Sequence, residues 1–159
     1  MSTIQVTNIN DLSDNAALVT DNGGIKTDKL TGKTTAGSIS VVGEGNSTTT
    51  NLQQGLTKVW INAPAAKNSI NDSFNVSSLD DDGAGDFGVH FTNDFASTNY
   101  CFAHGMDDGG TTTGIMSCDG TNGTYTTGSA DFETYFGNTS NNRNNIDQYS
   151  FIQIVGDLA

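Results

Sequence analysis

The chain has 159 residues and a formal net charge of −12, with six Lys and Arg against eighteen Asp and Glu. This length fits one ordinary domain with an appendage, and the charge excludes a general nucleic-acid binder, because phosphate recognition needs clustered cations. No apolar run approaches the length of a membrane span, and the first residues lack the basic and apolar stretches of a signal peptide. We therefore expect no membrane insertion, and synthesis in the cytosol.

Gly, Thr, Asn and Ser dominate the composition, whereas only 34% of the residues are apolar and proline occurs once, at Pro64. The aromatic residues fall in alternating patterns after residue 55. Thr, Phe and Tyr favour strands, and Gly, Asn and Asp favour turns. The composition therefore predicts an all-β chain with many tight connections.

Residues 1–54 contain no aromatic residue, and their apolar side chains come in isolated pairs such as Ile4 with Val6. Ordering a backbone costs roughly 1–2 kcal/mol per residue, and so little apolar mass cannot offset that cost. We therefore expect an extended N-terminal arm over residues 1–54, which is flexible or is ordered by docking on a partner. Such an arm indicates attachment to neighbours or homo-oligomerisation.

Residues 55–159 alternate apolar and polar side chains in short runs that turn signals separate. This layout predicts an antiparallel β-sandwich of about seven to eight strands. In one of the runs, Ile70, Phe74 and Val76 all take even positions, which places them on one face. The predicted runs are 58–62, 69–78, 86–95, 99–106, 131–136 and 149–155.

The densest acidic cluster extends from Asp80 to Asp86. Asp80, Asp82 and Asp86 are weak candidates for calcium ligands, because calcium prefers several oxygen atoms from a flexible loop. The cluster fails the EF-hand spacing, since Ala84 and Phe91 occupy the fifth and twelfth positions. The favoured interpretation is a polar hairpin loop whose glycines supply positive φ, with no cofactor.

The sequence predicts no catalytic residues. His90 and His104 are the only histidines, and each lies within a strand pattern. A catalytic triad or a zinc site needs a histidine that converges with a nucleophile or with further ligands, and no H-x-x-x-H, C-x-x-C or G-x-S-x-G string occurs. We expect strand packing or surface hydrogen bonding for both rings. Carboxylate pairs carry a weak signal, because eighteen acids make chance pairs common.

Cys101 and Cys118 are the only cysteines. A two-residue turn at Gly109-Gly110 would place them opposite each other in a hairpin. They would then form a non-hydrogen-bonded pair with Cα atoms about 4.5 Å apart, just inside the range that a disulfide tolerates. The sequence thus predicts neighbouring thiols that oxidise outside the cell, while assembly in a reducing cytosol leaves them as thiols.

Three blocks of the sequence go beyond composition. They are Gly55-Leu-Thr-Lys-Val-Trp-Ile-Asn62, Ser73-Phe-Asn-Val-Ser-Ser78 and Asp82-Gly-Ala-Gly-Asp-Phe-Gly-Val-His-Phe-Thr92. In this order they resemble a module of structural proteins from tailed phages, especially marine and cyanophage ones, that occurs in tail-fibre and other virion proteins. The resemblance covers roughly residues 52–100 well. The matching motif positions are Trp60, Phe74, Asp86, Phe87 and Phe91.

The resemblance implies a β-rich, usually trimeric virion protein that is assembled in the cytoplasm of a host bacterium, and it supplies no catalytic residues. We expect a short tail-fibre or appendage protein that contacts other virion proteins and attaches to the host surface, with host glycan as a candidate partner. A capsid decoration protein on the phage head is the alternative, because only about fifty residues precede the module. A glycan-active enzyme is the second alternative and has no specific support in the sequence.

Overall fold

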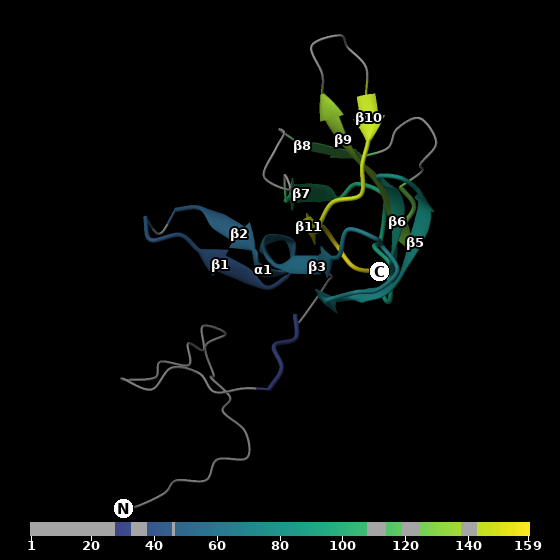
Figure 1. Ribbon diagram of the computed structural model, residues 1–159. Helices are drawn as coiled ribbons and strands as arrows, with labels where there is room; N and C mark the ends of the chain where they lie inside the picture. The colour runs from purple at the N-terminus through teal and green to yellow at the C-terminus, as the bar shows by residue number, and fades with distance from the viewer. Residues whose placement is uncertain (1–27, 33–37, 46, 108–113, 119–124, 138–142) are drawn as a thin grey trace, which may run out of the picture. The chain divides into compact units, whose positions relative to one another are not determined.

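A computed structural model of the chain describes residues 28–32, 38–45, 47–107, 114–118, 125–137 and 143–159 (Figure 1). The chain divides into two compact units, residues 1–31 and residues 32–159. Every helix and strand of the described residues belongs to the second unit, and all of its strand pairs are antiparallel. The prediction of an all-β, antiparallel fold is therefore confirmed.

One sheet of the second unit has four strands in the order β4-β3-β11-β7. Its last strand in sequence, β11, pairs with β3 on one side and with β7 on the other. Residues that are about ninety positions apart in the sequence thereby become neighbours. The bounds are β3 (Thr57–Ala63), β4 (Asp72–Phe74), β7 (Cys101–Met106) and β11 (Ser150–Val155).

The other sheet has five strands, in the order β10-β9-β6-β5 with β8 also paired to β9. The bounds are β5 (Val76–Gly83), β6 (Asp86–Phe91), β8 (Gly114–Cys118), β9 (Ser129–Gly137) and β10 (Arg143–Asn145). Strands β8 and β10 lie outside the predicted runs, so the described residues place nine strands in the two sheets where seven to eight were expected. The predicted acidic hairpin is present, because β5 pairs with β6, but its first three acids belong to β5 and the turn itself is Ala84-Gly85. Gly83, the last residue of β5, and Gly85 both have positive φ, as predicted.

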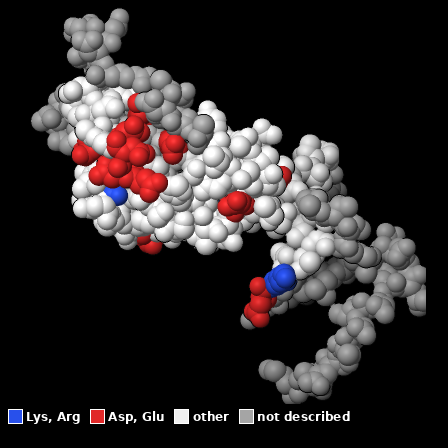
Figure 2. Space-filling view, turned by 90° about the vertical axis from the view of Figure 1, so that its right-hand side faces the viewer, with Lys and Arg blue, Asp and Glu red and all other residues white. Residues whose placement is uncertain are grey.

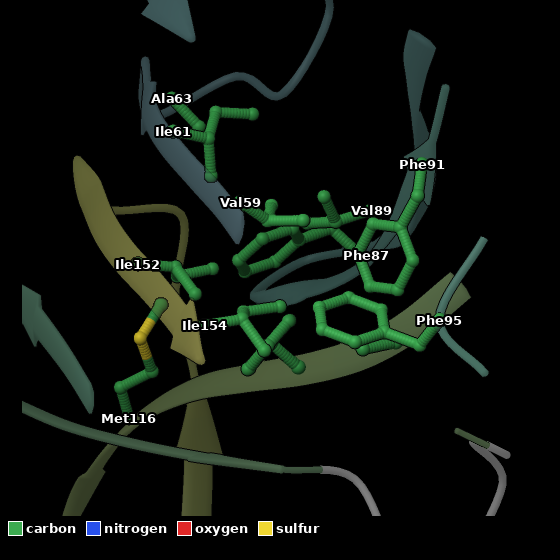
Figure 3. Close-up of a cluster of buried hydrophobic side chains, with 12 residues drawn as sticks. Val59, Ile61, Ala63, Phe87, Val89, Phe91, Phe95, Met116, Ile152 and Ile154 are labelled. Atoms are coloured by element: carbon green, nitrogen blue, oxygen red, sulfur yellow. The ribbon is translucent and has the colours of Figure 1, made fainter. Parts of the chain in front are cut away.

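The hydrophobic core lies between these two sheets (Figure 3). Strand alternation turns every second side chain inward, and Phe87 of the five-stranded sheet stacks on Phe132 with ring centroids 5.8 Å apart. Each fully buried side chain of this size stabilises the fold by about 1.5–3 kcal/mol relative to an exposed one. The buried hydrophobic residues are Val59, Ile61, Ala63, Phe87, Val89, Phe91, Phe95, Met116, Ala130, Phe132, Ile152 and Ile154.

The chain changes sheets at Asn75, between β4 and β5. Asn75 has a φ of 60°, a left-handed conformation that Asn tolerates better than most residues. Its side-chain Oδ1 accepts a hydrogen bond from the backbone N–H of Asn93 at 2.8 Å, and its Nδ2 donates to the Asn93 carbonyl at 3.1 Å. The prediction that Phe74 shares a face with Ile70 and Val76 is therefore wrong, because this corner sends Phe74 outward while the other two pack against the core.

A hairpin of β1 (Ser40–Val42) and β2 (Thr49–Asn51) precedes the sandwich, and the short helix α1 (Leu52–Gly55) follows it. Lys58 at the start of β3 donates hydrogen bonds to the carbonyls of Gln53 and Leu56, which ties the helix end to the sheet. Burial lowers the pKa of Lys58. Val41 and Val42 are exposed, and a two-stranded hairpin alone is only marginally stable in water.

Candidate functional site

The outer surface of the four-stranded sheet carries three exposed aromatic rings. Trp60 is 38% exposed, Phe74 52% and Phe151 46%. They come from β3, β4 and β11, and each takes the position in its strand that points away from the core. Their inward neighbours already fill the core, so the three rings are not needed there. We call this surface the aromatic face.

The register of the sheet arranges the aromatic face in two rows. In the first row, Trp60 lies directly between Phe74 on β4 and Gln153 on β11. In the second row, Asn62 of β3 lies opposite Phe151. The rings of Trp60 and Phe151 therefore occupy one diagonal of a square, and the amides of Asn62 and Gln153 occupy the other.

The four residues of this square line an open hollow of about 450 Å³, together with further residues of β3, β7 and β11. The residues that line the hollow are Trp60, Ile61, Asn62, Ala103, His104, Phe151, Ile152 and Gln153. None of them is an acid, a lysine or an arginine, although the whole chain has a net charge of −12. Uncharged aromatic surface of this kind marks a place where a protein makes contacts.

Both amides of the aromatic face are held by a neighbouring side chain. Gln153 Nε2 donates to Thr57 Oγ1 at 2.5 Å, and Asn71 Nδ2 donates to Asn62 Oδ1 at 3.1 Å. Within the described residues, the other polar atom of each amide makes no side-chain hydrogen bond. The face thus presents a positioned donor, Asn62 Nδ2, and a positioned acceptor, Gln153 Oε1.

The outer surface of the five-stranded sheet is acidic, in contrast to the aromatic face. Asp80 and Asp131 lie opposite Gly88 on either side, and Asp86 lies opposite Glu133 in the next row. Figure 2 shows Asp and Glu gathered in a dense patch on one side of the molecule. A Cβ atom on Gly88 would lie 3.0 Å from Asp131 Oδ1, so the glycine leaves room for that carboxylate.

The structure does not support the calcium candidates Asp80, Asp82 and Asp86. Among the described residues, no three His, Cys, Asp or Glu side chains come together in a group that could hold a metal ion. Asp80 instead pairs with His90, whose Nε2 lies 2.6 Å from Asp80 Oδ2. Both partners of this pair are well exposed, and such pairs contribute little to stability.

The two histidines lie on different sheets. His90 makes the surface contact with Asp80, and His104 on β7 stacks on Phe102 with ring centroids 6.1 Å apart. The expectation of surface hydrogen bonding or strand packing is thus confirmed for both. In the described part of the chain, the contacts of the two rings are with Asp80 and Phe102, and neither of these is a nucleophile of the serine or cysteine type.

The predicted hairpin that joins Cys101 to Cys118 is wrong. Strand β7, which carries Cys101, pairs with β11, while β8, which carries Cys118, pairs with β9 of the other sheet. Cys101 lies opposite Val155 and Cys118 opposite Phe132. Both described cysteines are thiols and not halves of a disulfide. The proposed turn at 109–110 lies outside the described residues.

This arrangement predicts a difference in thiol reactivity. Cys101 is exposed, whereas Cys118 is partly buried against the core. We expect a maleimide to modify Cys101 before Cys118 in the native protein, because the reagent must reach the sulfur. Mass spectrometry of the labelled peptides over time measures both rates. A gain of two hydrogens on chemical reduction would contradict the assignment of two thiols.

The structure separates the motif positions into two groups. Phe87 and Phe91 are core residues, and Asp86 begins the strand that carries them. Trp60 and Phe74 lie opposite each other on the aromatic face. The motif therefore contributes both to the core and to one side of the candidate site.

Sequence reasoning missed Phe151 and Gln153 as site residues, since they lie about ninety residues after Trp60. It also missed Lys67, whose side chain is buried at 2% exposure. Lys67 Nζ donates to the Pro64 carbonyl at 3.1 Å, to Ser150 Oγ at 3.0 Å and to the Gln148 carbonyl. For Phe151 and Gln153 the sequence held one signal: they alternate with Ile152 and Ile154, which are buried.

Comparisons with known proteins give no family assignment: no family model, no curated protein and no solved structure matches the chain. Among the described residues, no helix is both long enough and apolar enough to cross a bilayer.

Proposed function

We propose that the chain is a surface structural protein of a tailed-phage virion that acts by binding and not by catalysis. The aromatic face is the observation that carries the binding role, because three rings and two positioned amides lie exposed on a rigid sheet. The ordered sequence blocks that resemble phage tail-fibre modules support the virion assignment, and the third of them covers the end of β5, the turn after it and all of β6. The protein is proposed to assemble in the cytoplasm of the host bacterium.

The two outer surfaces of the sandwich support different roles. Carboxylates on the five-stranded sheet keep closely spaced copies soluble, because like charges repel. The aromatic face is the surface suited to a contact. The exposed Val41 and Val42 of the β1–β2 hairpin supply a second contact region, which we assign to the neighbouring copies of a trimer or to other virion proteins.

Within the virion we place the protein on a short tail fibre or appendage that attaches to the host surface. Immunogold labelling of purified particles, with an antibody raised against residues 57–107, tests this placement. Label at the tail supports the proposal, and label spread over the head assigns the protein to capsid decoration instead. Particles that contain no such chain by mass spectrometry and take up no label overturn the virion assignment.

A further inference from the structure

We propose that the aromatic face is a binding site for a neutral polysaccharide. The inference deepens the attachment role proposed above and rests on it for its biological meaning. It names both the ligand class and the residues that contact the ligand. Trp60 and Phe151 are the stacking platforms, and Asn62 and Gln153 supply the hydrogen bonds.

The chemistry of a sugar chain matches the diagonal arrangement of this face. A pyranose ring presents C–H groups on its flat sides, which pack on aromatic rings, and hydroxyl groups at its edge, which both donate and accept hydrogen bonds. Trp60 and Phe151 offer two separate ring surfaces, so consecutive sugar units can stack on them. Asn62 Nδ2 and Gln153 Oε1 lie beside the rings, where they can meet the hydroxyl groups.

Both amides are fixed before any ligand arrives. Thr57 holds Gln153 through Nε2, and Asn71 holds Asn62 through Oδ1, each by one hydrogen bond. The backbone beneath the rings is fixed as well, because Trp60, Asn62, Phe151 and Gln153 all belong to two paired central strands. Preorganised groups lose little freedom on binding, which raises affinity for a flexible chain such as a glycan.

Charge favours a neutral glycan over an anionic one. The residues that line the hollow carry no Lys or Arg to bind sulfate, phosphate or carboxylate groups. The net charge of −12 also repels an anionic polymer as it approaches. A neutral chain meets neither obstacle.

Size disfavours a second copy of this chain as the occupant. A stable protein interface uses about 20–30 residues on each side, whereas eight residues line this hollow. A hollow of about 450 Å³ falls within the range of small-ligand sites, roughly 300–1,000 Å³, and suits a few sugar units.

The chain carries its own reporter for this site, because Trp60 is its only tryptophan. Stacking of a sugar on the indole changes its emission and shields it from acrylamide. We therefore expect at least one member of a panel of neutral polysaccharides (laminarin, galactan, mannan and arabinoxylan) to shift the emission and reduce quenching. Alginate and dextran sulfate, which are anionic, should do neither.

Three variants of the full chain test the geometry. Phe151→Ala keeps the reporter and should weaken binding about tenfold, as loss of a central aromatic contact does. Gly105→Arg places a long side chain beside Phe151 without displacing any group, since a Cβ at Gly105 meets nothing within 4 Å. It should block binding even if Phe151→Ala fails to fold. Tyr125→Ala removes a ring that is equally exposed but lies outside the face, and should bind like the wild type.

Several results overturn the inference. They are no response to any neutral polysaccharide, a response to the anionic probes alone, or wild-type affinity in both Phe151→Ala and Gly105→Arg. Sedimentation that shows an oligomer which Gly105→Arg dissociates would assign the face to a second copy instead. If immunogold labels the particles but the aromatic face binds no glycan, only the ligand assignment fails. If the protein binds glycan but no particle carries the label, only the virion assignment fails.

Discussion

Replacing Gly85 by alanine is expected to destabilise the sandwich by about 4 kcal/mol or more, at the extreme end of single substitutions. Gly85 lies in the turn between β5 and β6 with a φ of +72°. A Cβ atom there would come within 2.2 Å of the Thr134 carbonyl oxygen and 2.6 Å of the Ile146 backbone nitrogen. These are backbone atoms, so the neighbours cannot move aside by changing a rotamer.

The clash falls on a hydrogen-bonded junction that joins three segments. Thr134 N–H donates to the Gly85 carbonyl at 2.6 Å, and Ile146 N–H donates to the Thr134 carbonyl at 3.0 Å. Gly85 N–H donates to Asp147 Oδ1 at 2.7 Å. An alanine would have to displace the turn from β9 and from the segment before β11, which breaks the two bonds that Gly85 makes to Thr134 and Asp147.

Two other glycines separate the causes of this loss. Gly83→Ala keeps a positive φ of 131° but meets nothing within 4 Å, so it should cost only the backbone strain, about 1–3 kcal/mol. Gly105→Ala meets nothing and has no positive φ, and should be close to neutral. Urea unfolding followed by circular dichroism measures all three. Equal midpoints for Gly85→Ala and Gly83→Ala would show that the close approach of Gly85 is not present in solution.

Strand positions and their faces could be predicted from the sequence, because the pleat of a strand alternates side chains. In the run 149–155 that rule separates Ile152 and Ile154 from Phe151 and Gln153, and the structure has the first pair in the core and the second pair on the outer surface. It failed at Asn75, where a left-handed residue breaks the alternation inside an apparently continuous run. Asn is one of the few residues that tolerate this conformation, so a signal existed, but Asn is too common in this chain to be informative.

Strand pairing between distant segments could not be predicted, because a local sequence pattern does not show which remote strand lies beside it. The assumption that strands next to each other in the sequence form a hairpin gave the wrong partner for Cys101. Its strand, β7, pairs with β11 and not with β8. The same long-range pairing brings Phe151 beside Trp60 and so creates the candidate site. In the sequence, the two strands that form the site are therefore two alternating runs with nothing to show that they pair.

Lys67 had no sequence signal at all, because a lysine in a polar turn normally points to solvent. Its burial follows from the acceptors around it: two backbone carbonyls and Ser150 Oγ take its three N–H groups. The ammonium also lies 4.5 Å from the centre of the Phe87 ring. Cation–π attraction and hydrogen bonding thus offset part of the cost of removing the charge from water.

Burial lowers the pKa of Lys67 to about 8, although the carboxylates of Asp147 and Asp81 act in the opposite direction. The unfolded chain keeps the ordinary lysine value, about 10.4. Between these two pH values the unfolded state binds more protons than the folded state, so the free energy of unfolding rises with pH. We expect a gain of up to about 3 kcal/mol across the whole window, since one pKa unit corresponds to about 1.4 kcal/mol.

The free energy of unfolding is best measured between pH 7.5 and 9.5. Above pH 10 Tyr100 acts in the opposite direction, because burial raises its pKa and its hydroxyl donates to the carbonyls of Thr126 and Ser129. The unfolded chain then loses a proton that the folded chain keeps, and stability falls. Lys58 adds a smaller rise of the same sign as Lys67, since its pKa is also lowered.

A Lys67→Met variant isolates the contribution of Lys67. Methionine fills a similar volume but has no ionisable group, so the variant should lose most of the rise in stability while keeping the part due to Lys58. Urea unfolding at closely spaced pH values gives the free energy of unfolding against pH for the wild type and the variant. The difference between the two curves is the contribution of Lys67. Parallel curves for the two proteins would mean that Lys67 reaches solvent, because an exposed lysine does not titrate near pH 8.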